Sequence, residues 1–267
     1  MSSLVRLLSI FDLYSEAQPI WTLEEIITET GFSRSTAYRY VKELCESGLL
    51  LAIGNGAHVL GPRMIEFDRQ IRNCDPLLMA AHKVLPSLEK YFGDHVLLLC
   101  SLYGDKVLSI HQQPQNTELH VSYTRGRPMP LFYGATAKVI LANLAERRLV
   151  KLFLDRRLEI AKAGLGSEWE DFKNTLQKIR QAGYSETHGE VDKGMVGVGV
   201  AIFAPDNRVI GSLSLVLTDD GHMIGTEIVD PLKTGSEQIT LEIETILAKH
   251  NEQIDSYSPV IPFNKIA

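Results

Sequence analysis

Residues 23–50, LEEIITETGFSRSTAYRYVKELCESGLL, contain two short amphipathic segments separated by one glycine. Thr22 and Glu25 have the T-x-x-E spacing of a capping box, so we expect a helix to begin just after Thr22. Gly31 suits the left-handed position that follows the end of a helix. Ser33 can cap a second helix, in which apolar residues repeat at three- and four-residue spacing. Two helices joined by such a tight turn are typical of a helix-turn-helix.

The neighbouring segments extend this motif into a small domain. Upstream, residues 4–11 carry three leucines and a phenylalanine at the spacing of one helix face. Downstream, the apolar runs 49–53 and 58–60 flank the turn Gly54-Asn55-Gly56, which is the pattern of a β-hairpin. Three helices and a hairpin predict a winged helix-turn-helix DNA-binding domain over residues 1–61.

The remainder of the chain predicts a second domain of the α+β class. A helix over residues 62–76, with a proline in its first turn, is expected to be a linker. Mostly antiparallel strands with helices before, between and after them are then expected over residues 77–250. A tail follows at 251–267. The predicted strands are 95–103, 106–113, 119–124, 195–204 and 208–217.

Composition narrows the possible classes of protein. Of 267 residues, 45% are hydrophobic and 22% are charged, which is ordinary for a globular protein. The formal net charge is −6, which excludes a nucleic-acid-binding protein that is basic over its whole surface. It does not exclude one basic face on one domain. No apolar run reaches the ~18 residues of a membrane span, and the N-terminus lacks the pattern of a signal peptide. We therefore expect a soluble cytoplasmic protein with reduced cysteines.

Four stretches of the chain resemble the IclR family of bacterial transcription regulators over residues 2–250. They are LEEIITETGFSRSTAYRYVKELCESGLL (23–50), HVLGPRMIEF (58–67), GRPMPLFYGATAKVILANL (126–144) and AGYSETHGEVDKGMVGVGVAIF (182–203). The resemblance implies a winged helix, a linker helix and a GAF-like effector-binding domain, assembled as a homodimer or a dimer of dimers. It also implies two partners, double-stranded operator DNA and a small organic acid.

The outward face of the third helix supplies the candidate DNA contacts. From Ser33 onward, three cations fall within nine residues, and the first acidic residue of this segment is Glu43. Hydroxyl groups at a helix N-terminus can reach phosphate, and arginine can reach guanine in the major groove. A merely solvated helix face is the alternative, which the turn and the wing disfavour. The candidates are Ser33, Arg34, Ser35, Thr36, Tyr38, Arg39, Lys42 and His58, although a plain strand position explains His58 equally well.

The candidate effector site lies around a helix that starts at Gly134-Ala135-Thr136. A helix N-terminus favours anions, and the resemblance implies that the carboxylate of the effector binds here. An ordinary helix start is the alternative. Gly197 stands where family members often carry cysteine, so we expect a wider pocket that suits an aromatic acid. The candidates are Tyr123, Tyr133, Gly134, Ala135, Thr187, His188, Glu190, Gly197, Ser212 and Ser214.

Neither a cofactor nor a metal is predicted. His95, Cys100, His111 and His120 lack the spacing of metal ligands, and no nucleophile occurs in a recognisable catalytic motif. The main hypothesis is a ligand-responsive, non-enzymatic transcriptional regulator, either a repressor or an activator. Two alternatives stay open. An enzyme acting on a small carboxylate predicts turnover, and a sensor acting through protein contacts predicts that Arg39→Ala changes nothing.

Overall fold

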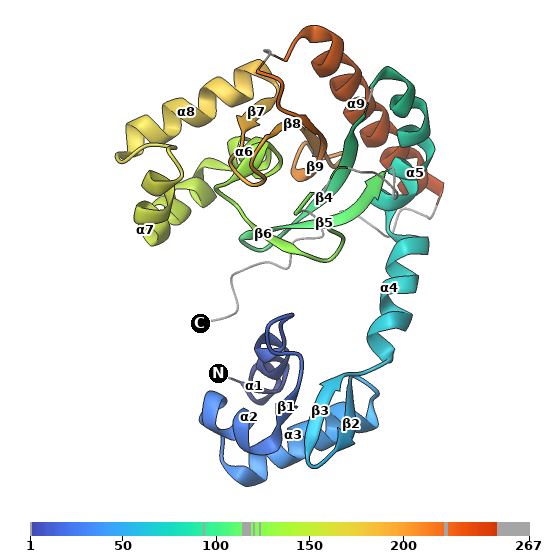
Figure 1. Ribbon diagram of the computed structural model, residues 1–267, viewed down its shortest axis with the longest axis vertical. Coiled ribbons are helices and arrows are strands. Elements are labelled where there is room, and N and C mark those ends of the chain that lie inside the picture. Colours follow the sequence, from blue (N-terminus) through green and yellow to red (C-terminus); the bar gives the residue numbers. More distant parts are fainter. Residues whose placement is uncertain are drawn as a thin grey trace. The chain divides into compact units, whose positions relative to one another are not determined.

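The computed structural model describes residues 2–92, 94–113, 119, 121–122, 124–221 and 224–249. They form two compact units, one up to Asp75 and one that begins at Pro76. Each unit has its own apolar core, and Figure 1 shows their helices and strands. No helix within these residues is long and apolar enough to cross a membrane.

The first unit is a winged helix-turn-helix. Its helices are α1 (Ser3–Leu8), α2 (Leu23–Thr30) and α3 (Arg34–Glu46), with a 3₁₀ turn at Ser9–Leu13, and its strands are β1 (Trp21–Thr22), β2 (Leu50–Gly54) and β3 (Ala57–Leu60). The strands pair antiparallel in the order β1-β3-β2. The hairpin of β2 and β3 was predicted, but β1 was not, because two residues are too few to show a period.

The local signals that predicted α2 are confirmed. The Glu25 carboxylate accepts a hydrogen bond from the Thr22 N–H at 2.7 Å, and the Thr22 hydroxyl accepts one from the Glu25 N–H at 3.3 Å. Gly31 ends the helix with φ at +67°, a conformation that glycine adopts without steric cost. These contacts fix the turn that leads into α3.

The predicted apolar face of the first helix is only partly correct. Leu4 is 66% exposed and Leu8 is 50% exposed, whereas Ile10 is fully buried. The α-helix ends at Leu8 and tightens into the 3₁₀ turn, which has three residues per turn instead of 3.6. The change in period rotates Ile10 into the core.

The helix predicted as a linker is α4 (Arg63–Cys74), and it belongs to the first unit. The second unit contains α5 (Pro76–Leu88), a 3₁₀ turn at Glu89–Tyr91, β4 (Val96–Tyr103), β5 (Lys106–Gln113), β6 (Pro128–Pro130), α6 (Gly134–Ala142), α7 (Glu146–Lys162), α8 (Trp169–Ala182), β7 (Ser185–His188), β8 (Met195–Phe203), β9 (Val209–Thr218) and α9 (Thr226–Lys249). This order has the α+β character that we predicted.

One antiparallel sheet organises the second unit, in the order β6-β5-β4-β9-β8-β7. Alternate side chains of β4, β8 and β9 point to opposite faces of the sheet. One face packs with α6, α7 and α8, and the other packs with α5 and α9 (Figure 1). Among the described residues, both faces of the central strands are therefore buried.

Two strand predictions need correction. The segment 119–124 was expected to be a strand, but its described residues, 119, 121, 122 and 124, lie outside any strand, and β6 follows at Pro128–Pro130. Residues 185–188, which are not among the predicted strands, form β7. The sequence SETH could not predict this strand, because the two residues that turn inward, Ser185 and Thr187, are polar and give no alternation of apolar and polar residues. The other four predicted strands agree with β4, β5, β8 and β9 within a residue or two.

Candidate DNA-binding and effector sites

Helix α3 separates its side chains into a buried face and an exposed face. Ala37, Tyr40, Val41 and Leu44 are packed in the core of the first unit. Ser33 caps the helix, since its hydroxyl accepts a hydrogen bond from the Thr36 N–H at 3.4 Å. The opposite face carries the predicted DNA contacts, which are all solvent-accessible: Ser33, Arg34, Ser35, Thr36, Tyr38, Arg39 and Lys42.

The three cations on this face are held differently. Arg34 forms an ion pair at 2.5 Å with Glu24, which lies on α2. Lys42 lies 3.6 Å from Glu46, one turn further along α3. Arg39 stacks over the Tyr40 ring at 5.5 Å and has no carboxylate partner within the described residues. Exposed pairs of this kind contribute little stability, so phosphate groups can replace the two carboxylates at small cost.

His58 lies on β3, the central strand of the small sheet, between Trp21 and Ala52. Its Nδ1 is buried and has no hydrogen-bond partner within the described residues. The exposed tip of the wing is instead Gly54-Asn55-Gly56, which carries no charge. A role for His58 in DNA contact stays a prediction, and it has weaker geometric support than the α3 residues.

The N-terminus of α6 binds two side chains of the same chain. The Gly134 N–H donates to the Glu190 carboxylate at 3.0 Å, and the Ala135 N–H donates to the Thr187 hydroxyl at 3.0 Å. The other Glu190 oxygen forms an ion pair with Lys138. Glu190 therefore occupies, with its own carboxylate, the position where the family resemblance implied the carboxylate of an effector.

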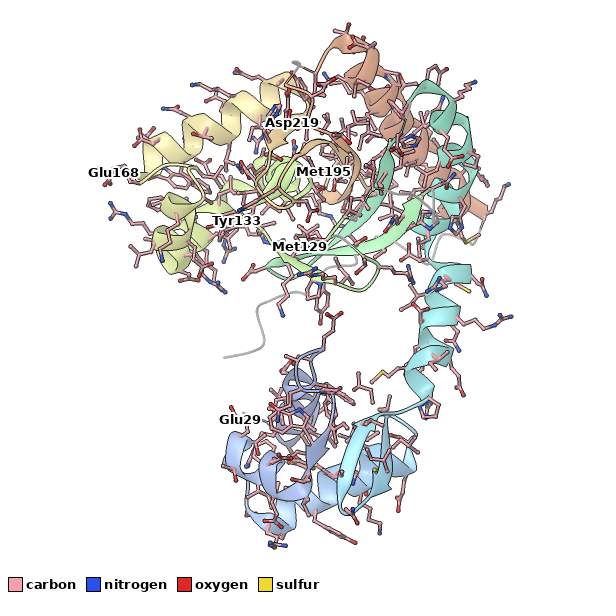
Figure 2. The ribbon with its side chains drawn as sticks, in the orientation of Figure 1. Glu29, Met129, Tyr133, Glu168, Met195 and Asp219 are labelled. Atoms are coloured by element: carbon pink, nitrogen blue, oxygen red, sulfur yellow. The ribbon has the colours of Figure 1, made fainter. Side chains whose placement is uncertain are left out.

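A small cavity of about 30 Å³ lies beside this helix end. Figure 2 marks its neighbourhood with Tyr133, just before α6, and Met195, at the start of β8. The cavity has room for about one water molecule, whereas a site for a benzene ring needs about 150 Å³. The wider pocket that we expected is thus closed here. Its lining residues are Gly134, Ala135, Thr136, Thr187, Glu190, Val191, Asp192, Met195, Gly197 and Val216.

Five of the ten predicted effector residues line this cavity: Gly134, Ala135, Thr187, Glu190 and Gly197. Four of the others lie outside the cavity lining, and one falls outside the described residues. Ser214 accepts a hydrogen bond from the Thr136 hydroxyl at 2.9 Å, and the buried Ser212 hydroxyl has no partner within the described residues. Tyr133 and His188 lie outside the lining, and Tyr123 falls outside the described residues.

Sequence reasoning missed Asp192 and Met195 as lining residues. The Asp192 carboxylate accepts hydrogen bonds from the N–H and the hydroxyl of Ser122, so it joins two segments that lie seventy residues apart. Both residues belong to the 182–203 stretch that carried the family resemblance, but no local pattern separates lining residues from their neighbours there. Only the fold of the β7–β8 connection determines which ones face α6.

Two glycines of β8 differ in how closely α6 approaches them. A Cβ atom at Gly199 would lie 3.0 Å from the carbonyl group of Ala135 and from the Ser214 hydroxyl. A Cβ atom at Gly197 would meet the Thr187 hydroxyl at 3.5 Å and the Ala135 Cβ at 3.7 Å, which are ordinary contacts. Gly199 thus permits the close packing of α6 on the sheet, and Gly197 leaves the space of the cavity.

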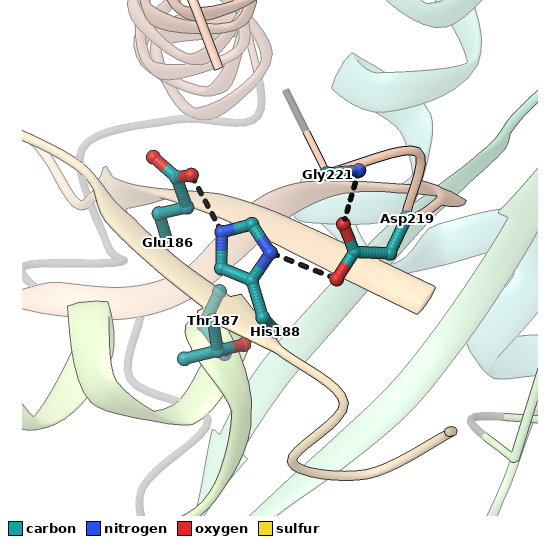
Figure 3. Close-up of polar contacts among 6 residues, drawn as sticks. Glu186, Thr187, His188, Asp219 and Gly221 are labelled. Carbon is teal, nitrogen blue, oxygen red and sulfur yellow. Dashed lines mark hydrogen bonds and ion pairs between the residues drawn. The ribbon is translucent and has the colours of Figure 1, made fainter. Parts of the chain in front are cut away.

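His188 belongs to a separate polar cluster at the end of β7 (Figure 3). Its Nε2 lies 2.9 Å from Glu186, and its Nδ1 lies 2.9 Å from Asp219, which follows β9. These two carboxylates raise the pKa of His188 above its usual 6.5. The Asp219 pKa is lowered, first by His188 and then by the Gly221 N–H. His188 therefore ties β7 to the segment after β9.

The candidate metal ligands do not form a site within the described part of the chain. No group of three His, Cys, Asp or Glu residues there has the geometry to hold a metal ion. Burial raises the pKa of Cys100 to about 12, so its thiol stays protonated at neutral pH. His120 lies outside the described residues.

Two family models account for most of the chain. Residues 3–52 match the IclR helix-turn-helix domain, and residues 73–240 match the C-terminal domain of the bacterial transcriptional regulator IclR. The chain belongs to the IclR family. Its members are DNA-binding transcriptional regulators. The two family models confirm the predicted helix-turn-helix and the α+β fold of the C-terminal domain.

Known proteins of this family are similar over four fifths of the chain or more. The regulator KipR of Bacillus subtilis is 23% identical over 80% of this chain and 84% of its own length. The transcriptional repressor IclR of Escherichia coli is 23% identical over 82% of this chain and 83% of its own. An IclR regulator structure from Alicyclobacillus acidocaldarius superposes with a TM-score of 0.71 at 20% identity, covering 90% of this chain and 98% of that one.

A further structural neighbour is an IclR homologue from Microbacterium hydrocarbonoxydans, which was solved in complex with 4-hydroxybenzoate. It superposes with a TM-score of 0.67 at 19% identity and covers 91% of this chain and all of that one. At this identity the likeness demonstrates a shared fold.

Proposed function

We propose that this protein is a ligand-responsive regulator in which α3 enters the major groove of operator DNA and the second unit binds a small organic acid. The observation that carries the first half is the polarity of α3. Its apolar residues are all in the core, while Arg34, Arg39 and Lys42 share the exposed face with four hydroxyl-bearing side chains. A recognition helix needs this separation, because its outer face must contact phosphates and base edges.

A mobility-shift titration tests this reading of α3. The DNA is the promoter region next to the protein's own gene, used at two salt concentrations. Arg39→Glu should abolish the specific shift, because Arg39 is the α3 cation with no carboxylate partner in the described structure. Arg147→Glu makes the same charge change on exposed α7 and should bind as wild type. Equal binding by both variants and wild type would exclude α3 as the reading helix.

The effector half of the proposal rests on the α6 cavity and its two backbone donors. The neighbour complexed with 4-hydroxybenzoate supports an acid as the ligand class. In the present structure, an incoming carboxylate must first displace Glu190 from Gly134 and enlarge the cavity. The effector therefore binds one conformation of the second unit better than another, and this differential affinity is what can alter DNA binding.

Calorimetry with a panel of aliphatic and aromatic acids tests the effector proposal. If the acid binds and chromatography shows it chemically unchanged, the result supports a ligand-responsive regulator. A new product would support the enzyme alternative. Glu190→Gln should bind the same acids more tightly, because the competing internal carboxylate is neutralised. Identical affinities for variant and wild type would place the effector away from α6.

Subunit pairing through α4 completes the proposal. No residue of α4 is buried within the single chain, and its apolar side chains are open, with Ile65 73% exposed. Such a stripe is unusual for a helix with no partner. Ile65→Lys should shift the protein toward monomer in light scattering and weaken operator binding, since two half-sites require two subunits. An unchanged oligomeric state would exclude α4 as the interface.

A further inference from the structure

The outer edge of the large sheet is incomplete beside β8. Strand β7 pairs with β8 only from Val196 to Gly199. Residues 200–203 of β8 thus have no strand neighbour on that side within the described structure. In Figure 1, α8 and α9 lie on either side of this edge. The open edge, the C-terminal end of α8 and one face of α9 enclose a groove.

This groove is far larger than the cavity at α6. Its volume is about 570 Å³, within the range of about 300–1,000 Å³ typical of small-molecule sites. It shares no lining residue with the α6 cavity. Its lining residues are Asn143, Arg180, Gln181, Ala182, Gly183, Val200, Ala201, Phe203, Asn207, Lys233, Ser236, Glu237, Thr240 and Leu241.

Two cations on the groove wall are anchored but keep free donors. The Arg180 guanidinium donates to the carbonyl groups of Ala142 at 2.7 Å and Leu144 at 3.3 Å. The Lys233 ammonium donates to the Ala182 carbonyl at 2.7 Å. Neither cation has a carboxylate partner within the described residues, and Arg180 has five N–H donors in all. Glu237 is the one acid among the lining residues, so the wall carries a net positive charge.

The groove also offers apolar surface and resists strand addition. Phe203 is partly buried, and Leu241 is 59% exposed on the α9 side. The Ser236 hydroxyl donates to the Ala201 carbonyl, which points out of the open edge. Because this carbonyl is already engaged, an added peptide strand would lose a ladder hydrogen bond there. A compact ligand with one anionic and one apolar end fits these features better.

We propose that the β8-edge groove is a second ligand site, which takes an aryl or branched alkyl carboxylate. The carboxylate lies against Arg180 and Lys233, and the apolar part lies against Phe203 and Leu241. The site is independent of the effector proposal for α6, since the two regions share no residue. A regulator with two such sites can respond to two acids, or to one acid at two concentrations.

Fluorescence titration of the full chain with 2-naphthoate tests this site, with 2-naphthamide as the neutral analogue. The amide should bind about tenfold more weakly, as expected when one charge-assisted contact is lost. Leu241→Glu should weaken 2-naphthoate binding by roughly tenfold or more, because it adds a negative charge and removes an apolar contact. Glu237→Gln should strengthen binding, since it removes the one acid of the wall.

Leu154→Glu is the matched control, because Leu154 is 75% exposed on α7 and lies outside the groove lining. It makes the same substitution without changing the groove and should bind as wild type. Equal binding by Leu241→Glu and Leu154→Glu would overturn the proposal, as would equal affinity for the acid and the amide. Absence of 2-naphthoate binding at millimolar concentration would overturn it too.

Discussion

Replacement of Glu190 by Gln tests how the closed cavity at the N-terminus of α6 is stabilised. Gln retains an oxygen that can accept the Gly134 N–H, so the substitution removes mainly the charge that pairs with Lys138. The Lys138 side chain is 10% exposed and that of Glu190 is 28% exposed. Leaving a buried ammonium group without its partner costs about 3–5 kcal/mol when burial is complete. Because Glu190 is partly hydrated, we expect a loss of about 2 kcal/mol.

In a unit of this size, such a loss corresponds to a fall in Tm of roughly 4–8 °C, measured by circular dichroism. Lys138→Met alone should lower the free energy of unfolding by less, because the Glu190 carboxylate would still accept the hydrogen bond from the Gly134 N–H and would stay partly hydrated. The double variant should recover part of the loss, with a coupling energy of about 1–2 kcal/mol. If Glu190→Gln has the same Tm as wild type, the ion pair does not stabilise the closed cavity. The same conclusion follows if the losses of unfolding free energy in the two single variants add up to the loss in the double variant.

Three further predictions concern other parts of the molecule. Gly199→Ala should destabilise the second unit by about 1–3 kcal/mol in chemical denaturation, because its Cβ would overlap α6, whereas Gly197→Ala should be tolerated. Glu24→Gln frees a cation of α3 and should steepen the salt dependence of DNA binding by about one phosphate contact, unlike the control Glu29→Gln on the same helix. The raised pKa of His188 means that its contribution to stability is complete below pH 6.5 and is lost as pH rises through the higher folded value. The stability difference between wild type and His188→Gln should therefore shrink between pH 6 and pH 8, and a difference independent of pH would contradict the role of the charged imidazole.

Local signals in the sequence were sufficient for the helix-turn-helix of the first unit. The capping box of Thr22 and Glu25, the left-handed Gly31 and the spacing of apolar residues each act within one or two helical turns, so they can be recognised without the fold. The first helix shows where such reasoning fails. Its switch to a 3₁₀ turn buries Ile10 instead of Leu8, and this depends on contacts with α2 and α3 that no local pattern records.

The sequence also located the helix start at Gly134 and the 182–203 stretch, which together build half of the predicted effector site. It could not show that Glu190, 56 residues away, already binds the Gly134 N–H. It could not show that Ser214 is hydrogen-bonded to Thr136 and does not line the cavity. It also could not predict β7, because the sequence of this strand is polar.

The sequence by itself therefore determined the helix-turn-helix, the face of α3 that is exposed, and the α+β class of the second unit, because these follow from local capping and periodicity. The tertiary structure alone decided which side chains meet at the N-terminus of α6 and how small a cavity they leave. It also decided that β8 extends beyond its pairing with β7, so that a groove opens at the sheet edge. Those features arise from strand pairing between distant segments, and the register of that pairing is set by the packing of both sheet faces together.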